Sequence, residues 1–363
     1  MSELKNMISD SVVRLFSEQV DRKVLDAAES GAWPAALWER VEEGGYHRLL
    51  TPEAQGGAGG TWDDAYPVLH AQGYYRAPVP LSETLLGNYL LAAVGLPVPD
   101  GPLSLIQQGV NNSLSLTLQG PQVVLSGAVP SVPWARHARG FVVCGRAGEH
   151  ELLLLVSADA KGVSLVNAES VSREPHDTVT FSNCATDLAV RAAGKLPPQA
   201  VLVFGALARA IMLVGAAESV LHTTVQYAND RVQFGKPIGK FQAIQQALAI
   251  LASEVTSAQS AALAAVAPRA GANGKLSRFD IAVAKIRAGQ AAGQVAAIAH
   301  QVHGAFGFTY EHTLQYATRR LWTWRAEFGA ESAWARELGE MAIRGGGQKF
   351  WANLTAGFEN RAQ

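Results

Sequence analysis

The hydrophobic pattern of this chain changes twice along its length. Over residues 1–112 and again over 196–363, apolar residues recur at the three- and four-residue steps of a helix face, as between Val12 and Phe16. Over residues 113–195, short apolar and β-branched runs alternate with Gly, Pro, Asn and Asp, which is typical of strands and turns. We therefore predict a mainly α chain with a central β domain, divided into an N-terminal helical domain, a middle β domain and a C-terminal helical domain at these boundaries.

The clearest helical stripe leads into residues 227–246, with the sequence YANDRVQFGKPIGKFQAIQQ. Apolar residues approach this segment at steps of three, four or seven: Leu207, Ile211, Val214, Leu221 and Val225. A second stripe with helical spacing begins near its end: Phe241, Ile244, Leu248 and Leu251. Between the stripes, Gly235 and Gly239 allow unusual backbone angles and Pro237 cannot continue a helix. The pattern predicts two helices joined by a turn over residues 233–239.

The polar residues at this turn offer a particular chemistry. Arg231 carries a planar, permanently charged guanidinium that suits a phosphate or pyrophosphate, and the glycines allow a backbone to approach such a ligand. Gln242, Gln245 and Gln246 add neutral donors and acceptors. The alternative for an isolated Arg-x-x-Phe-Gly is a plain helical hairpin whose arginine is only solvated.

Charge and composition exclude several classes of protein. The formal net charge is −1 and the pI is about 6.8, so we expect no strongly basic surface for nucleic acid or membrane lipids. Cys144 and Cys184 have neither metal-ligand spacing nor the pattern of a disulfide framework, which favours a reducing cytoplasm. The first 20 residues mix charges into an amphipathic pattern unlike that of a signal peptide, and no continuous apolar run is long enough to span a bilayer. We expect a cytoplasmic protein without a metal site.

The string over residues 231–245 resembles, nearly residue for residue, a segment of the acyl-CoA dehydrogenase family of flavoproteins, Arg-x-x-Phe-Gly-x-Pro-Ile-x-x-Phe-Gln-x-x-Gln. Residues 44–60 are similar to the family's Gly-x-x-Gly-Leu-x-x-Pro-Glu-x-x-Gly-Gly segment. Residues 301–311, QVHGAFGFTYE, are similar to its Gln-x-x-Gly-Gly-x-Gly-Phe/Tyr-x-x-Glu segment. The resemblance implies an N-terminal helical domain, a small β-barrel or sheet domain and a C-terminal four-helix bundle.

The same resemblance implies FAD as the cofactor and names its contacts. Carried over position by position, the implied cofactor-binding residues are Arg231, Gln233, Phe234, Gln242, Gln301, Gly304 and Gly307. In the family, the second segment approaches the pyrophosphate and adenosine end of FAD, commonly across a subunit interface from the first. The resemblance therefore also implies an oligomer, either a homodimer or homotetramer or a heterotetramer with a related subunit.

The family's reaction needs a carboxylate that removes a proton α to a thioester carbonyl while a hydride leaves the β carbon for the flavin. In the commonest branch this base is the Glu of a Tyr-Glu-Gly-Thr string, which falls here on residues 327–330, EFGA, with the acid displaced by one position. Glu327 is therefore the candidate catalytic residue, and Phe328 stands at the position of the base. Another branch places its base on the helix before the turn, where residues 204–213 contain no carboxylate. Glu218, on the apolar stripe of that helix, is predicted to be an ion-pair partner.

The implied function is α,β-dehydrogenation of a coenzyme A thioester in fatty acid or lipid catabolism, with electron-transfer flavoprotein as the electron acceptor. Two alternatives stay open. The family's Thr-Glu-Pro-x-x-Gly-Ser-Asp loop has no counterpart in residues 101–120, and this absence, with Phe328, suggests a base-deficient subunit whose related partner supplies the base and the acyl pocket. The second alternative is a flavin monooxygenase or oxidase on the same scaffold, for which a missing base is tolerable.

Overall fold

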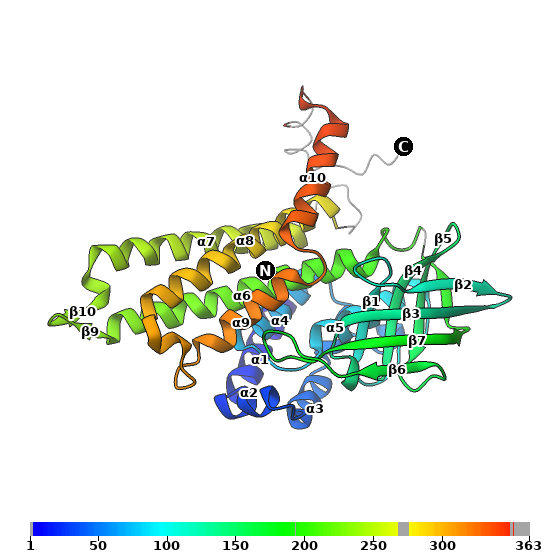
Figure 1. The fold of residues 1–363 in the computed structure, drawn as a ribbon, viewed down its shortest axis with the longest axis horizontal. Coiled ribbons are helices and arrows are strands. Elements are labelled where there is room, and N and C mark those ends of the chain that lie inside the picture. Colours follow the sequence, from blue (N-terminus) through cyan, green and yellow to red (C-terminus); the bar gives the residue numbers. More distant parts are fainter. Residues whose placement is uncertain (1–2, 193, 268–275, 349–350, 352–363) are drawn as a thin grey trace. The chain divides into compact units, whose positions relative to one another are not determined.

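A computed structural model describes residues 3–192, 194–267, 276–348 and 351 (Figure 1). The α-helices are α1 (Glu3–Gln19), α2 (Arg22–Glu29), α3 (Ala35–Glu43), α4 (Trp62–Tyr75), α5 (Leu81–Val94), α6 (Ala200–Asp230), α7 (Gln242–Val266), α8 (Arg278–His303), α9 (Leu314–Ala326) and α10 (Glu331–Gly345). The strands are β1 (Leu103–Gln107), β2 (Ser115–Gln119), β3 (Gln122–Pro133), β4 (Gly140–Ala147), β5 (His150–Ser157), β6 (Val163–Val166), β7 (His176–Thr186), β8 (Ala189–Arg191), β9 (Val232–Gln233) and β10 (Lys236–Pro237). Helices with a central set of strands confirm the predicted fold class.

The chain divides into two compact units. The first unit comprises residues 1–18, 66–77 and 206–363, and the second comprises 19–65 and 78–205. The division into three domains at residues 112 and 195 stays a prediction.

The first unit is a bundle of helices. Helix α7 packs along α8, and α8 also contacts α9 and α10. Helix α6 ends at Asp230 and α7 begins at Gln242, so the predicted pair of helices joined by a turn is confirmed (Figure 1). The turn itself contains the short hairpin β9–β10.

Helices α4 and α6 approach each other closely within this unit because glycine stands at two of their contacts. A Cβ atom on Gly73 would lie 2.1 Å from the carbonyl oxygen of Met212, and one on Gly215 would lie 2.1 Å from that of His70. Glu218 of α6 lies 2.8 Å from His70 of α4, measured between Oε2 and Nε2, so this acid is paired as predicted. The hydrogen bond from His70 lowers the pKa of the Glu218 carboxyl, although burial opposes the shift.

Among the described residues, two helices have the length and composition to cross a bilayer, which differs from the sequence expectation. The most apolar window of α6 has a mean hydropathy of 2.2 but is 94% buried within the protein, and a helix that is apolar all round is typical of a core. The corresponding window of α7 has a mean hydropathy of 1.3 and is 33% buried.

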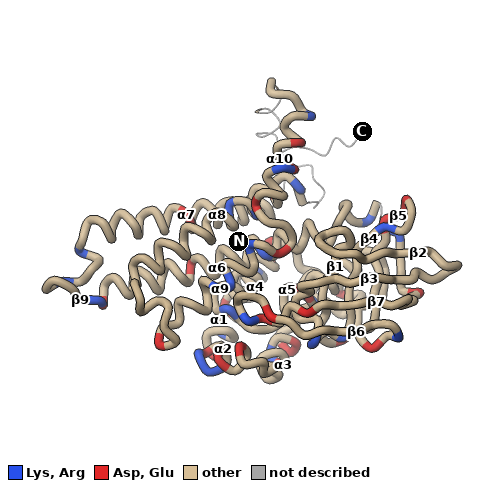
Figure 2. Tube along the Cα trace, viewed as in Figure 1, with Lys and Arg blue, Asp and Glu red and all other residues tan. Residues whose placement is uncertain are grey.

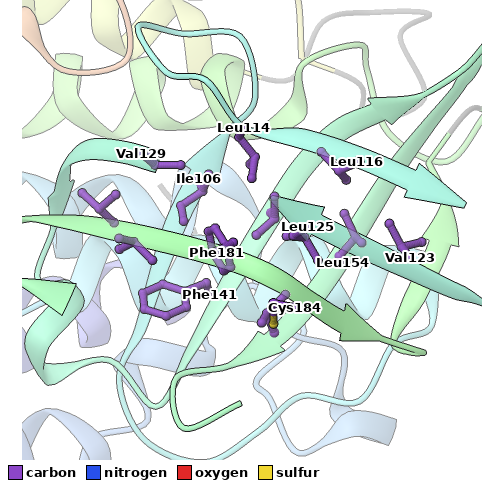
Figure 3. Packing of buried hydrophobic residues seen from close by; sticks show 14 of the residues in the cluster. Ile106, Leu114, Leu116, Val123, Leu125, Val129, Phe141, Leu154, Phe181 and Cys184 are labelled. Atoms are coloured by element: carbon purple, nitrogen blue, oxygen red, sulfur yellow. The ribbon is translucent and has the colours of Figure 1, made fainter. Parts of the chain in front are cut away.

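The second unit contains two four-stranded sheets, in the orders β1-β4-β5-β8 and β2-β3-β7-β6. Strands β1 and β4 are parallel, and the other neighbours are antiparallel. Apolar side chains from both sheets form one core, in which the rings of Phe141 and Phe181 meet edge to face at 6.1 Å (Figure 3). Strand β1 lies in the range predicted to be helical. All its residues are buried, so it lacks the polar alternation that reveals a half-exposed strand.

Candidate functional site

The hairpin after α6 is built on an uncommon turn. Strand β9 pairs with β10 so that Gln233 lies opposite Lys236, and the two residues between them, Phe234 and Gly235, have φ angles of 52° and 77°. Positive φ at both central residues is the type I′ geometry that matches the twist of a two-residue hairpin. A positive φ angle strains the backbone of Phe234, because this residue is not a glycine. The residue is 92% exposed.

The second predicted segment begins where α8 ends. His303 is the last residue of α8, and Gly304 follows with φ 60° and ψ −147°, a backbone conformation that is essentially confined to glycine. The chain then continues as a short 3-10 helix over Gly304–Phe308. A Cβ atom on Gly304 would meet no described atom within 4 Å, so this backbone is open on one side.

These two segments line one pocket of about 620 Å³. Of the predicted residues, the following five line it: Arg231, Gln233, Phe234, Gln301 and Gly304. Both walls come from this chain. Gln242 and Gly307 are not among the described residues that line the pocket. Gly307 is instead buried, and a Cβ atom there would lie 2.9 Å from Cβ of His303, so its glycine is required by packing.

Positive charge surrounds the hairpin. Arg231 directly precedes β9, Lys236 begins β10, and Lys240 follows it. Figure 2 shows blue, basic segments around β9. The neighbouring Asp230 accepts a hydrogen bond from Gln226 at 2.8 Å. Over the described part of the chain, no side chain bonds the guanidinium of Arg231, which is exposed and lines the pocket. The guanidinium N–H groups of Arg231 are therefore available in the pocket to donate hydrogen bonds to an anionic ligand.

An aromatic wall, made of Tyr227, His303, Phe306 and His312, stands beside these polar residues. Tyr227 and His303 stack with their ring centroids 4.3 Å apart, and Phe306 is parallel to Tyr227 at 6.0 Å. His312 meets the edge of the His303 ring at 4.7 Å. Sequence reasoning missed Tyr227. The signal that could have found it is its position in the last turns of α6, four residues before Arg231.

The histidines of this region are neutral at pH 7. Burial lowers the pKa of His303 to about 4, and burial also lowers the pKa of His312 and of His300. Nδ1 of His303 lies 2.8 Å from the carbonyl oxygen of Ala299, which assigns the single ring proton to Nδ1. Nε2 of His303 is buried and has no hydrogen-bond partner among the described residues.

The candidate base lies in a different environment. Oε2 of Glu327 is 2.6 Å from Nε of Arg209, and the two side chains are 11% and 2% exposed. The guanidinium of Arg209 also lies over the ring of Phe328, 5.4 Å from its centroid, and Phe328 has a φ of 51°. Glu327 is not among the described residues that line the pocket. Sequence reasoning missed Arg209, although an arginine on a buried apolar helix is itself a signal for a counter-ion.

A buried lysine holds the backbone next to this ion pair. Nζ of Lys285 donates to the carbonyl oxygens of Arg325 and Gly329 at 2.7 and 2.8 Å, and the side chain is fully buried. Burial lowers the pKa of Lys285 to about 7, while Glu331 and Glu327 oppose the shift. Because Arg325 belongs to the last turn of α9, Lys285 satisfies a carbonyl that the helix leaves unpaired.

Two profiles of one protein family match this chain, one in its N-terminal part and one in its C-terminal part. The family profile "Acyl-CoA dehydrogenase, N-terminal domain" matches residues 2–96, and "Acyl-CoA dehydrogenase, C-terminal domain" matches residues 198–340. Among curated relatives, acyl-CoA dehydrogenase IpdE2 of Mycolicibacterium smegmatis is 28% identical over 324 residues, which cover 88% of this chain and 93% of the relative.

Solved structures give the same fold. The steroid ACAD Tcur3481-Tcur3483 is 25% identical, with a TM-score of 0.85 over 94% of this chain and 98% of that chain. The ChsE4-ChsE5 complex from Mycobacterium tuberculosis is 22% identical, with a TM-score of 0.83 over 94% of this chain and 97% of that chain.

Proposed function

The chain belongs to the acyl-CoA dehydrogenase family, and we propose that it binds FAD in the pocket between the β9–β10 hairpin and the Gly304 turn. In this proposal it acts in the α,β-dehydrogenation of a coenzyme A thioester. The observation that supports the proposal most strongly is the free guanidinium of Arg231 in a pocket that also contains the second family segment.

The residues of the pocket fit a dinucleotide. Arg231 would hold the pyrophosphate through charge-assisted hydrogen bonds, and the side-chain amides of Gln233 and Gln301 would serve the neutral ribose and adenine groups. The open backbone at Gly304 lets such a ligand come close. We also propose that Gln242 and Gly307 serve the cofactor. Gln242 would act through its exposed amide, and Gly307 through the close packing against His303 that a glycine permits.

The reaction removes two hydrogens from adjacent carbons of the acyl chain. Bound FAD supplies the acceptor for the hydride that leaves the β carbon. The remaining step is removal of the α proton by a carboxylate, for which Glu327 is the candidate in this chain. A carboxylate that pairs with a permanent cation is a weak base, because the cation stabilises its ionised form.

This ion pair favours a second candidate function. We infer that the chain works as one subunit of a heteromeric dehydrogenase, in which it supplies cofactor contacts and a related subunit supplies the base. The Arg209–Glu327 pair supports this inference, since it engages the only acid of residues 327–330. The chain is also similar to the ChsE4-ChsE5 complex, which contains two different proteins. We further propose a cytoplasmic location, a role in lipid catabolism and electron-transfer flavoprotein as the acceptor, on the basis of family membership.

One set of measurements tests both candidates. The purified chain should show flavin absorbance after reconstitution with FAD, and a complete lack of bound FAD would reject the cofactor site. Anaerobic addition of a panel of acyl-CoA thioesters then follows bleaching of the flavin, with the chain alone and with a co-purified related subunit. Bleaching only in the mixture supports the heteromer. Bleaching by the chain alone, lost in Glu327→Gln with FAD retained, assigns the base to Glu327 and rejects the heteromer.

A further inference from the structure

Tyr227 joins the two walls of the pocket. It lies on α6 one turn before Arg231, and its carbonyl oxygen accepts the backbone N–H of Arg231 at 2.9 Å. Its side chain reaches the other wall, where the hydroxyl donates to the carbonyl oxygen of His303 at 3.3 Å. One residue therefore contacts the segment that carries the guanidinium and the segment that ends at Gly304.

The acceptor of this hydrogen bond is a helix end. His303 is the last residue of α8, and the final carbonyls of a helix have no partner within the helix. The Tyr227 hydroxyl supplies a partner at the residue before Gly304, the point where the backbone turns away. A bond at this position fixes where the Gly304 turn begins relative to α6.

Stacking adds to the hydrogen bond. The rings of Tyr227 and His303 are inclined by only 23°, and Phe306 lies nearly parallel to Tyr227 on the 3-10 helix that follows. The ring of His303 is held in place by its hydrogen bond to Ala299 and is uncharged at pH 7. A neutral ring that cannot rotate freely makes a stable stacking partner.

From these contacts, and resting on the proposed function, we propose that Tyr227 is a positioning residue that sets the distance between Arg231 and the Gly304 turn, so that both contact the same FAD. In this role the hydroxyl and the ring act through the two walls. Binding of the adenosine and pyrophosphate end of the cofactor therefore depends on Tyr227, while binding of the isoalloxazine end does not.

The test compares Tyr227→Phe with a matched control. Tyr227→Phe removes only the hydroxyl. Tyr74→Phe removes the hydroxyl that lies 3.0 Å from Nδ1 of His222, another contact between α6 and a neighbouring segment, but one whose residues do not line the pocket. A second pair of variants separates ring stacking on Tyr227 from the mere presence of an apolar side chain at position 303. His303→Phe keeps an aromatic ring, and His303→Leu does not. For each purified variant we would measure the dissociation constants of FAD, ADP and FMN and the melting temperature.

We expect Tyr227→Phe to weaken the binding of FAD and of ADP by the same factor, about threefold, because the variant loses one weak neutral hydrogen bond. FMN binding by Tyr227→Phe should stay unchanged, and Tyr74→Phe should bind all three ligands like the wild type. His303→Phe should bind FAD more tightly than His303→Leu. If Tyr227→Phe and Tyr74→Phe bind FAD equally, or if FMN weakens as much as ADP, the positioning role is wrong. If the wild type binds neither FAD nor ADP, the proposed function itself fails.

Discussion

Arg209 and Glu327 form a buried ion pair that links α6 to the end of α9, with Nε of the arginine 2.6 Å from Oε2 of the glutamate. Arg209 lies within residues 204–213, where one branch of the family keeps its base, and Glu327 lies beside the position used by the other branch. The two possible locations of a catalytic carboxylate are thus joined by a structural contact in this chain.

Breaking this pair should destabilise the protein. Glu327→Gln removes the carboxylate that pairs with the buried Arg209 guanidinium, so we expect the free energy of unfolding to fall by about 3–5 kcal/mol. The double variant Arg209→Met with Glu327→Met should recover most of that loss, because both charges are removed together. Urea unfolding of the wild type, the single variant and the double variant checks the expectation. Equal stability of the wild type and Glu327→Gln would contradict it.

Arg231→Ala should weaken FAD binding at least tenfold, since hydrogen bonds to a charged group contribute about 1.5–3 kcal/mol each. The fold should be unaffected, because the side chain is exposed and is not bonded within the described residues. Arg336→Ala, an exposed arginine on α10 outside the pocket, serves as the control for the loss of one positive charge. Flavin fluorescence titrations measure the dissociation constant of FAD for both variants. Full retention of FAD by Arg231→Ala would remove the assignment.

Phe234→Gly separates stability from binding. Glycine relieves the strain of the positive φ angle but adds freedom to the unfolded chain, and the two effects are each about 1 kcal/mol, so they offset. We therefore expect an unchanged melting temperature together with weaker FAD binding, because the ring is lost from the pocket. Phe234→Asn, which also tolerates this conformation, should weaken FAD to the same extent. A variant that melts much lower would show that the ring supports the fold.

Lys285 should make stability depend on pH above neutrality. Its pKa is about 7 in the folded protein and 10.5 for an ordinary lysine, so between these values only the unfolded chain holds the proton. The free energy of unfolding should therefore rise with pH through this window, by up to about 1.4 kcal/mol per pH unit from this residue. Unfolding in urea from pH 7 to 10 measures the slope.

Lys285→Met should lose that part of the slope. Lys195→Met is the control, since Lys195 is exposed and also donates to one carbonyl, that of Val94. The same slope in the wild type and in Lys285→Met would mean that Lys285 keeps its proton in the folded protein.

Local spacing was sufficient to predict much of the helical architecture. The stripe that ends at Val225 and the glycines and proline after it predicted α6, the hairpin region and α7, because these signals depend only on neighbours in the chain. Strand β1 was missed because a strand buried on both faces has no alternation. Its five residues, LSLIQ, do not differ in pattern from about a turn and a half of buried helix.

The candidate site was predicted in part. The resemblance named five of the residues that line the pocket, including Arg231 and Gly304. It could not reveal the Tyr227–His303 stack or the Arg209–Glu327 pair, whose members are 76 and 118 positions apart. Such contacts arise only when helices pack, and a pattern of neighbouring residues holds no information about them. The sequence therefore named Glu327 as a candidate base without revealing the arginine that pairs with it.

The exposed rings at the pocket have a practical consequence for handling the protein. Phe234 on the hairpin and Phe306 on the 3-10 helix both line the pocket, and they are 92% and 40% exposed. Uncovered aromatic surface of this kind adsorbs to hydrophobic matrices and promotes aggregation. A preparation stripped of nucleotide should therefore bind phenyl resin more strongly than one kept in FAD, and cell lysis in FAD-containing buffer should improve the yield of dispersed protein.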